Sequence, residues 1–110
     1  MKRMTEQEML DTIKDDIKIV VEDLDKNRVG DKLVVSDYAS DKMGEIKDMI
    51  TLYLSDGDKS NGIHVCRKKN MALHELGIDI YLRSFIGDAI YVTATYGNKF
   101  GILLGELSKE

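Results

Sequence analysis

The chain has 110 residues, of which 43% are hydrophobic and 33% are charged, and its formal net charge at pH 7 is -4. The composition contains no proline and is typical of a globular protein, which excludes a disordered or fibrous chain. Acidic and basic residues are interspersed rather than gathered into a basic stripe, so nucleic acid is not an expected partner. We therefore predict one domain that spans residues 1–110.

The N-terminal sequence MKRMTEQEML passes from two basic residues directly into polar sequence. A secretion signal would need an apolar stretch of about 7 to 15 residues at this point. No apolar run in the chain approaches the roughly 18 residues that cross a bilayer. The single cysteine, Cys66, cannot form an internal disulfide framework. These features predict a cytoplasmic protein without membrane contact.

A long first helix is predicted to begin near Thr5. Thr5 and Glu8 have the spacing of a capping box, in which each residue bonds a free backbone N–H of the other. Apolar residues then recur at steps of three and four until the polar stretch 27–30. They are Leu10, Ile13, Ile17, Val20, Val21 and Leu24.

The next segment, 31–57, is predicted to contain a short strand and a second helix. The strand is centred on Leu33 to Val35. The helix begins after Ser40 or Asp41 and ends at the turn sequence 55–57. Its apolar face is expected to contain Ile46, Met49, Ile50, Tyr53 and Leu54. A second strand is predicted at 63–68, followed by one or two helical turns from Asn70 to Gly77.

A strand hairpin is predicted from Ile78 to Tyr96, with Gly87 and Asp88 as a two-residue turn that pairs Ile86 with Ala89. This register places one set of side chains on each face of the sheet. One face has Ile80, Leu82, Tyr91, Thr93 and Thr95, and the other has Tyr81, Arg83, Phe85, Ile90, Val92 and Ala94. Since both faces contain apolar residues, both need to be covered, by helices of this chain or by another molecule.

Residues 98–108 can form either a strand or a helix. A helix capped by Asn98 places four apolar residues on one face, and we favour it because two glycines would weaken a strand. Gly101 and Gly105 would then lie four residues apart on one side and permit close approach of a neighbour. The predicted class is α+β, with a long N-terminal helix and further helices packed on a small, mainly antiparallel sheet.

The C-terminal third, Ile78 to Lys109, resembles the roadblock family, in which the last strand leads into a C-terminal helix. The stretches IYLRSFIGDAIYVTATYGN and KFGILLGELSK carry this resemblance, and the long first helix also suits that fold. The family has a strand hairpin between its first two helices, where this chain has only KLVVSDYA. The resemblance implies a non-enzymatic protein that dimerises, commonly by extending a sheet and pairing helices, and that acts as a scaffold or regulator of small GTPases.

Candidate metal ligands are the most suggestive polar residues. They are His64, Cys66, His74 and Glu75, which are chemically competent to bind zinc. Their spacing matches no standard zinc pattern, so we predict no metal and no other cofactor, with a zinc site as an alternative. No third member of a triad and no oxyanion site accompanies the cysteine. We therefore predict no catalytic residue and a protein that is not an enzyme.

We predict a homodimer that works by binding another protein. The expected interface combines apolar residues of one sheet face, a rim arginine and the two glycines of the terminal helix. It consists of Tyr81, Arg83, Phe85, Ile90, Val92, Gly101 and Gly105. An alternative is a small acidic inhibitor of the kind phages encode, which would present an acidic face of the first helix to a basic partner. That face contains Asp15, Asp16, Glu22, Asp23 and Asp25.

Overall fold

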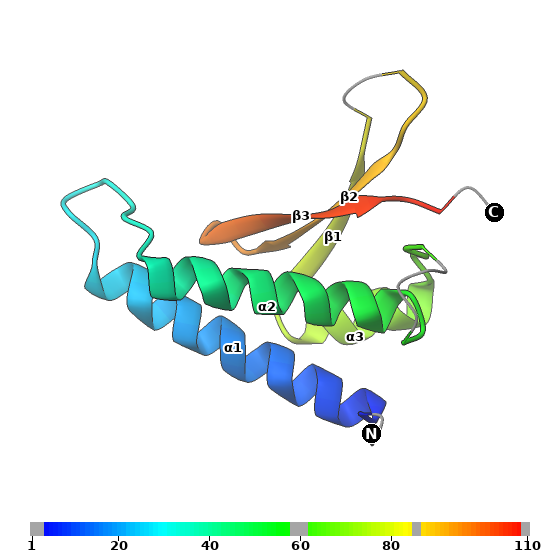
Figure 1. The fold of residues 1–110 in the computed structure, drawn as a ribbon, viewed down its shortest axis with the longest axis horizontal. Coiled ribbons are helices and arrows are strands. Elements are labelled where there is room, and N and C mark those ends of the chain that lie inside the picture. Colours follow the sequence, from blue (N-terminus) through cyan, green and yellow to red (C-terminus); the bar gives the residue numbers. More distant parts are fainter. Residues whose placement is uncertain (1–3, 58–61, 85–86, 109–110) are drawn as a thin grey trace. The chain divides into compact units, whose positions relative to one another are not determined.

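The computed structural model describes residues 4–57, 62–84 and 87–108 and has three helices and one antiparallel sheet (Figure 1). In chain order these are α1 (Glu6–Lys26), α2 (Asp37–Leu54), α3 (Arg67–Glu75), β1 (Ile78–Arg83), β2 (Tyr91–Tyr96) and β3 (Phe100–Glu106). The predicted α+β class, with a long N-terminal helix, is confirmed. Two compact units, residues 1–49 and 50–110, divide the chain inside α2, and the single domain remains a prediction.

In the first unit, α1 begins at the predicted capping box. The Glu8 amide donates to Thr5 Oγ1 over 3.1 Å, and the Thr5 amide donates to Glu8 Oε1 over 2.9 Å. Hydrogen bonding of the Glu8 carboxylate to Thr5, foremost to its backbone amide, lowers the pKa of Glu8. Four residues of the predicted apolar stripe, Ile13, Ile17, Val20 and Leu24, are buried, which confirms the orientation of the helix. Leu10 and Val21 are only half-buried, and Met9 is buried in addition.

The predicted strand at Leu33 to Val35 is wrong. The connection forms a tight turn around Gly30, which has φ +60, and the turn is closed by two backbone hydrogen bonds between Val29 and Lys32. The three apolar residues that follow are 42–49% exposed and pair with no strand in the described part of the first unit. A strand needs a partner for its backbone groups, and this segment pairs with no partner among the described residues.

Helix α2 begins earlier than predicted because Ser36, not Ser40 or Asp41, is its cap. Ser36 Oγ accepts a hydrogen bond from the Ala39 amide over 3.0 Å and donates one to Asp23 Oδ2 over 2.5 Å. The second bond connects the start of α2 to α1 within the first unit, where the two helices run antiparallel (Figure 1). The predicted end of α2 is confirmed at Leu54.

We expect Ser36→Ala to lower the free energy of unfolding by about 1 kcal/mol, because the Ala39 amide loses its cap. Ser40→Ala is the matched control, since Ser40 is an exposed position within the same helix, where alanine is the better helix former. Urea unfolding of both variants measures the difference. Equal midpoints for the two variants would contradict the assignment of Ser36 as the cap.

In the second unit, α3 is held near the end of α2 by one lysine. Lys69 Nζ donates to the Tyr53 carbonyl over 2.6 Å and forms an ion pair with Asp56. The hydrogen bond from Lys69 lowers the pKa of the Asp56 carboxyl. The predicted strand at 63–68 is wrong, because within the described structure only Ile63 of this segment pairs, in a parallel bridge to Leu107. Helix α3 then begins at Arg67, three residues before the predicted Asn70.

The predicted helix at 98–108 is wrong, because this segment forms β3. A turn with Gly97 at φ +54 brings the chain back beside β2, where it pairs antiparallel from Phe100↔Tyr96 to Tyr91↔Glu106. The strand buries Ile102 and Leu104 on one face, with a bulge opposite Val92 and Thr93. Gly101 lies opposite Thr95 and Gly105 lies opposite Val92, on opposite faces of the sheet, so they form no small-residue stripe.

The predicted register of β1 and β2 is wrong by one residue. Pairing runs from Ile78↔Tyr96 to Arg83↔Tyr91. The predicted pair of Ile86 with Ala89 lies outside the described residues, because Ile86 is not among them. A shift of one residue moves every side chain of β2 to the other face relative to β1. The observed register gathers the buried apolar side chains of the sheet on one face, which we call the covered face. Its buried residues are Ile78, Val92, Ala94, Ile102 and Leu104.

A candidate binding groove along strand β1

Strand β1 has one free edge. The sheet order is β1-β2-β3, so β1 pairs only with β2. Among the described residues, no backbone group of Ile78–Arg83 bonds to any other element. Alternate residues of an edge strand direct both their N–H and their C=O groups outward. This edge therefore offers a row of donors and acceptors that another strand can use.

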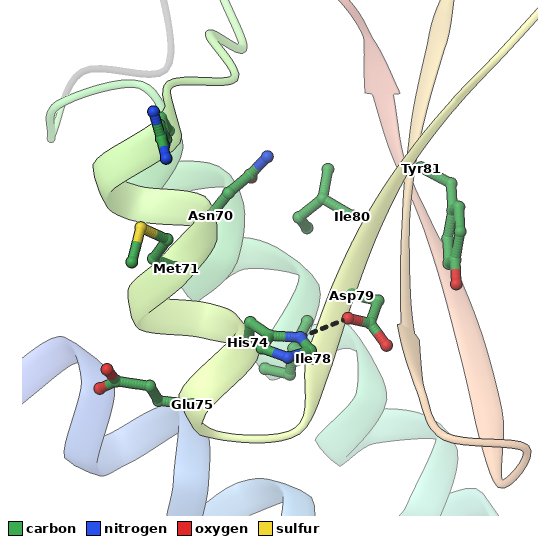
Figure 2. A pocket seen from close by; sticks show the side chains of 9 residues that line it. Asn70, Met71, His74, Glu75, Ile78, Asp79, Ile80 and Tyr81 are labelled. Atoms are coloured by element: carbon green, nitrogen blue, oxygen red, sulfur yellow. Dashed lines mark hydrogen bonds and ion pairs between the residues drawn. The ribbon is translucent and has the colours of Figure 1, made fainter.

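Helix α3 lies beside β1, and a cleft of about 650 Å³ separates their side chains (Figure 2). Helix α3 contributes residues of one face, which begin at Arg67 and follow it by three, four, seven and eight positions. Strand β1 contributes four successive residues, although successive side chains of a strand point to opposite faces. The cleft therefore runs along the edge of the strand, and we call it the edge groove. Its lining residues are Arg67, Asn70, Met71, His74, Glu75, Ile78, Asp79, Ile80 and Tyr81.

The apolar part of the edge groove is unusually open to solvent. Met71 of α3 is 57% exposed and Tyr81 of β1 is 47% exposed, whereas Ile78 between them is buried. Leu82, the next residue along β1, is 51% exposed. Exposed apolar side chains that gather beside an unpaired strand edge are typical of contact surfaces for another polypeptide.

The polar part of the groove has a histidine–aspartate pair and an unpartnered amide oxygen. His74 Nδ1 and Asp79 Oδ1 are 2.7 Å apart, and both side chains are well exposed. Asn70 extends from α3 towards Ile80 (Figure 2), and its Oδ1 is buried without a hydrogen-bond partner in the described structure. The lining contains no serine, threonine or cysteine beside the pair. The exposed side chains of His74 and Asp79 are suited to hydrogen bonding a bound chain.

The predicted interface residues fall in different environments. Tyr81 and Arg83 are exposed on β1, and Ile90 is exposed just before β2. Val92 is fully buried on the covered face, so it is not accessible for its predicted contact with a partner. The register shift explains this, since it moves Val92 away from the face of Tyr81 and Arg83. Gly101 and Gly105 belong to β3, on the far side of β2, and Phe85 lies outside the described residues.

The predicted metal ligands are not assembled into a site. His74 pairs with Asp79 in the edge groove, and Cys66 is exposed at the start of α3. His64 is half-buried in the preceding segment. Over residues 4–57, 62–84 and 87–108, no group of three or more His, Cys, Asp and Glu side chains is placed to hold a metal ion.

The acidic face of α1 is partly neutralised within the first unit. Asp16 Oδ1 lies 4.0 Å from Lys42 Nζ, and partial burial raises the pKa of Asp16 despite this cation. Asp23 accepts the hydrogen bond from Ser36, and Asp25 lies 3.8 Å from Arg28. These contacts reduce the acidic surface that α1 can present to a basic partner.

The described structure is therefore that of an α+β protein with a helix-flanked, unpaired edge strand. No family model, curated protein or solved structure matches the chain. The predicted C-terminal helix, on which the resemblance to the roadblock family depends, is a strand here. No helix in the described ranges has the length and apolar character needed to cross a membrane.

Sequence reasoning identified β1 and α3 separately but missed the groove between them. The sequence IDIYLR has the composition of a strand, and residues 67, 70, 71, 74 and 75 have the spacing of one helix face. Neither pattern shows which edge of a strand is left without a neighbour. Only the order of strands in the sheet makes β1 an edge.

Proposed function

We propose that this chain is a protein-binding module rather than an enzyme, and that its edge groove accepts an extended segment of a polypeptide as an additional strand. One observation carries the proposal: the unpaired edge of β1 forms one wall of an open cleft whose other wall is α3. The module would act as a scaffold or a regulator, because its effect comes from binding.

The edge groove offers the two kinds of contact that an added strand needs, which are main-chain hydrogen bonds and side-chain contacts. A segment that pairs with β1 gains main-chain hydrogen bonds along the edge, which provide affinity without regard to sequence. Alternate side chains of the segment would point towards α3, where Met71 and Ile80 offer apolar contact. The others would lie on the opposite face beside Tyr81. Selectivity would then come from the side chains that enter the groove.

Met71→Lys tests this proposal. Met71 is exposed, so the variant is expected to fold, and the added charge would lie where an incoming strand needs apolar contact. Extended peptides selected on the wild-type protein from a random library are the probe. We expect their affinity for the variant to fall about tenfold or more, which corresponds to about 1.4 kcal/mol. Fluorescence anisotropy measures the affinity.

Leu103→Lys is the matched control, because Leu103 is 51% exposed on β3, away from β1. Its affinity for the same peptides is expected to equal that of the wild type. Amide exchange should also slow in residues 78–83 when a peptide binds. The proposal is abandoned if the wild-type protein neither selects a peptide nor associates with itself, or if both variants lose affinity equally.

A further inference from the structure

We infer that the strand the edge groove accepts is β1 of a second copy of this chain, paired antiparallel across a two-fold axis at Tyr81. This inference rests on the proposed function, since it names the occupant of the same groove. The two sheets would join edge to edge through their β1 strands, with their covered faces on the same side. The charges of β1, its apolar residues and its possible registers all favour this pairing.

The charges of β1 are complementary to those of a reversed copy of the same strand. Asp79 and Arg83 lie two positions on either side of Tyr81 and point to the same face. In the proposed pairing, Asp79 of each copy lies directly opposite Arg83 of the other, so two opposite-charge pairs form. Tyr81 lies opposite its own equivalent. Opposite charges and aromatic pairs are favourable at directly opposed positions of antiparallel strands.

Asp79 can take part in this pairing while it keeps its existing contact. Its Oδ1 lies 2.7 Å from His74 Nδ1, which leaves the other carboxylate oxygen for an arginine. An ionised carboxylate accepts several hydrogen bonds, so the two contacts are compatible. His74 would then orient the carboxylate from the α3 side of the groove.

On the other face of β1, the proposed pairing brings apolar side chains of the two copies into contact. The same register places Leu82 of the second copy opposite Ile80, on the face of β1 that also carries the buried Ile78. Leu82 is 51% exposed and Met71 is 57% exposed in the single chain. Ile80 lines the groove with Met71, so Leu82 of the second copy would enter the groove between them. The pairing thus removes from water the exposed apolar side chains of the groove.

Neighbouring registers lack this complementarity. In a continuous sheet whose covered faces lie on the same side, two directly opposed residues must point to the same face. This holds only if the two-fold axis lies at a residue that is opposed to its own equivalent, and not between two residues of the strand. An axis at Ile80 would place Asp79 opposite Tyr81 and Arg83 opposite Gly77. An axis at Leu82 would place Arg83 opposite Tyr81. Only the axis at Tyr81 opposes each acidic residue to a basic one.

Cysteine cross-linking tests the register. On a Cys66→Ser background, Tyr81→Cys should form a disulfide with its equivalent under mild oxidation, because directly opposed Cβ atoms are about 4.5–5.5 Å apart. Leu82→Cys is the matched control. Leu82 has similar exposure, but the two equivalents would be diagonal neighbours about 7–8 Å apart. Cross-linking at Leu82 without cross-linking at Tyr81 would overturn the inferred register.

Reversal of the charges at positions 79 and 83 tests whether the partner is a second copy of the chain. We expect wild-type protein to be a dimer by light scattering. Arg83→Asp alone, or Asp79→Arg alone, should raise the dimer dissociation constant about tenfold or more, because like charges become opposed twice. An equimolar mixture of the two variants should form a heterodimer, since every opposed pair is again of opposite sign. Urea unfolding of each variant shows whether it is folded.

The outcomes separate this inference from the proposed function. A wild-type protein that stays monomeric but binds selected peptides in the edge groove overturns the inference and leaves the proposed function in place. A dimer that both charge variants retain also overturns it. Recovery of the dimer in the mixture, together with cross-linking at Tyr81, supports a second copy of the chain as the occupant.

Discussion

Gly77→Ala is expected to lower the free energy of unfolding by about 3 kcal/mol. Gly77 ends α3 and leads into β1 with φ +92, a backbone conformation that alanine adopts only at a cost. An added Cβ would also lie 2.9 Å from Cε1 of Tyr96, whose ring stacks on Phe100 at 5.9 Å between centroids. Relief of the clash must therefore disturb a packed aromatic pair.

Gly97→Ala is the matched control for this prediction. Gly97 also has a positive φ, of +54, but an added Cβ there would meet nothing within 4 Å. Gly97→Ala should lower the free energy of unfolding by only about 1 kcal/mol, because alanine is strained at a positive φ. Urea unfolding of both variants measures the difference, and equal losses would show that the contact with Tyr96 is unimportant. Because Gly77 joins α3 to β1, it also sets the geometry of the edge groove.

Val92→Asp is expected to lower the free energy of unfolding by about 4 kcal/mol or more. Val92 is fully buried on the covered face, so a carboxylate there would be removed from water. For a chain of this length the total stability is about 5–15 kcal/mol, so the variant should be largely unfolded at moderate temperature. Circular dichroism and urea unfolding measure the loss.

Thr93→Asp is the control for the burial of Val92. Thr93 is the next residue of β2 and its side chain points to the opposite, partly exposed face. Thr93→Asp should lower the free energy of unfolding by about 1 kcal/mol, because aspartate has a lower strand propensity than threonine. A folded, stable Val92→Asp protein with altered association would instead support the sequence-based interpretation, in which Val92 contacts a partner.

The candidate site was predictable only in part. Tyr81 and Arg83 were expected at a contact surface because β1 has apolar residues on both faces, and both are exposed. Val92 was wrongly grouped with them because the composition of Gly87-Asp88 suggests a two-residue turn. The strands instead stop pairing at Arg83↔Tyr91, and this changes the register by one residue. The turn sequence cannot reveal the register, because burial of a whole face decides it.

The contribution of α3 to the site was not predictable from local patterns. Residues 67–75 were recognised in part as helical, but the groove depends on where that helix lies beside β1. The buried Oδ1 of Asn70 and the pair of His74 with Asp79 arise from this arrangement. His74 was considered as a metal ligand because its residue type is suited to zinc, whereas its neighbour in space is a single carboxylate.

The sequence by itself determined the elements whose stability is local. The capping box at Thr5 and the apolar period of α1 depend on residues three and four positions apart, and the glycine that ends α3 depends on its own φ. The tertiary structure alone decided the state of residues 100–106 and 33–35. Strand β3 forms because β2 supplies a partner for its backbone groups, although two glycines weaken it. Leu33 to Val35 have strand composition but pair with no segment in the described part of the chain, and so they form no strand there.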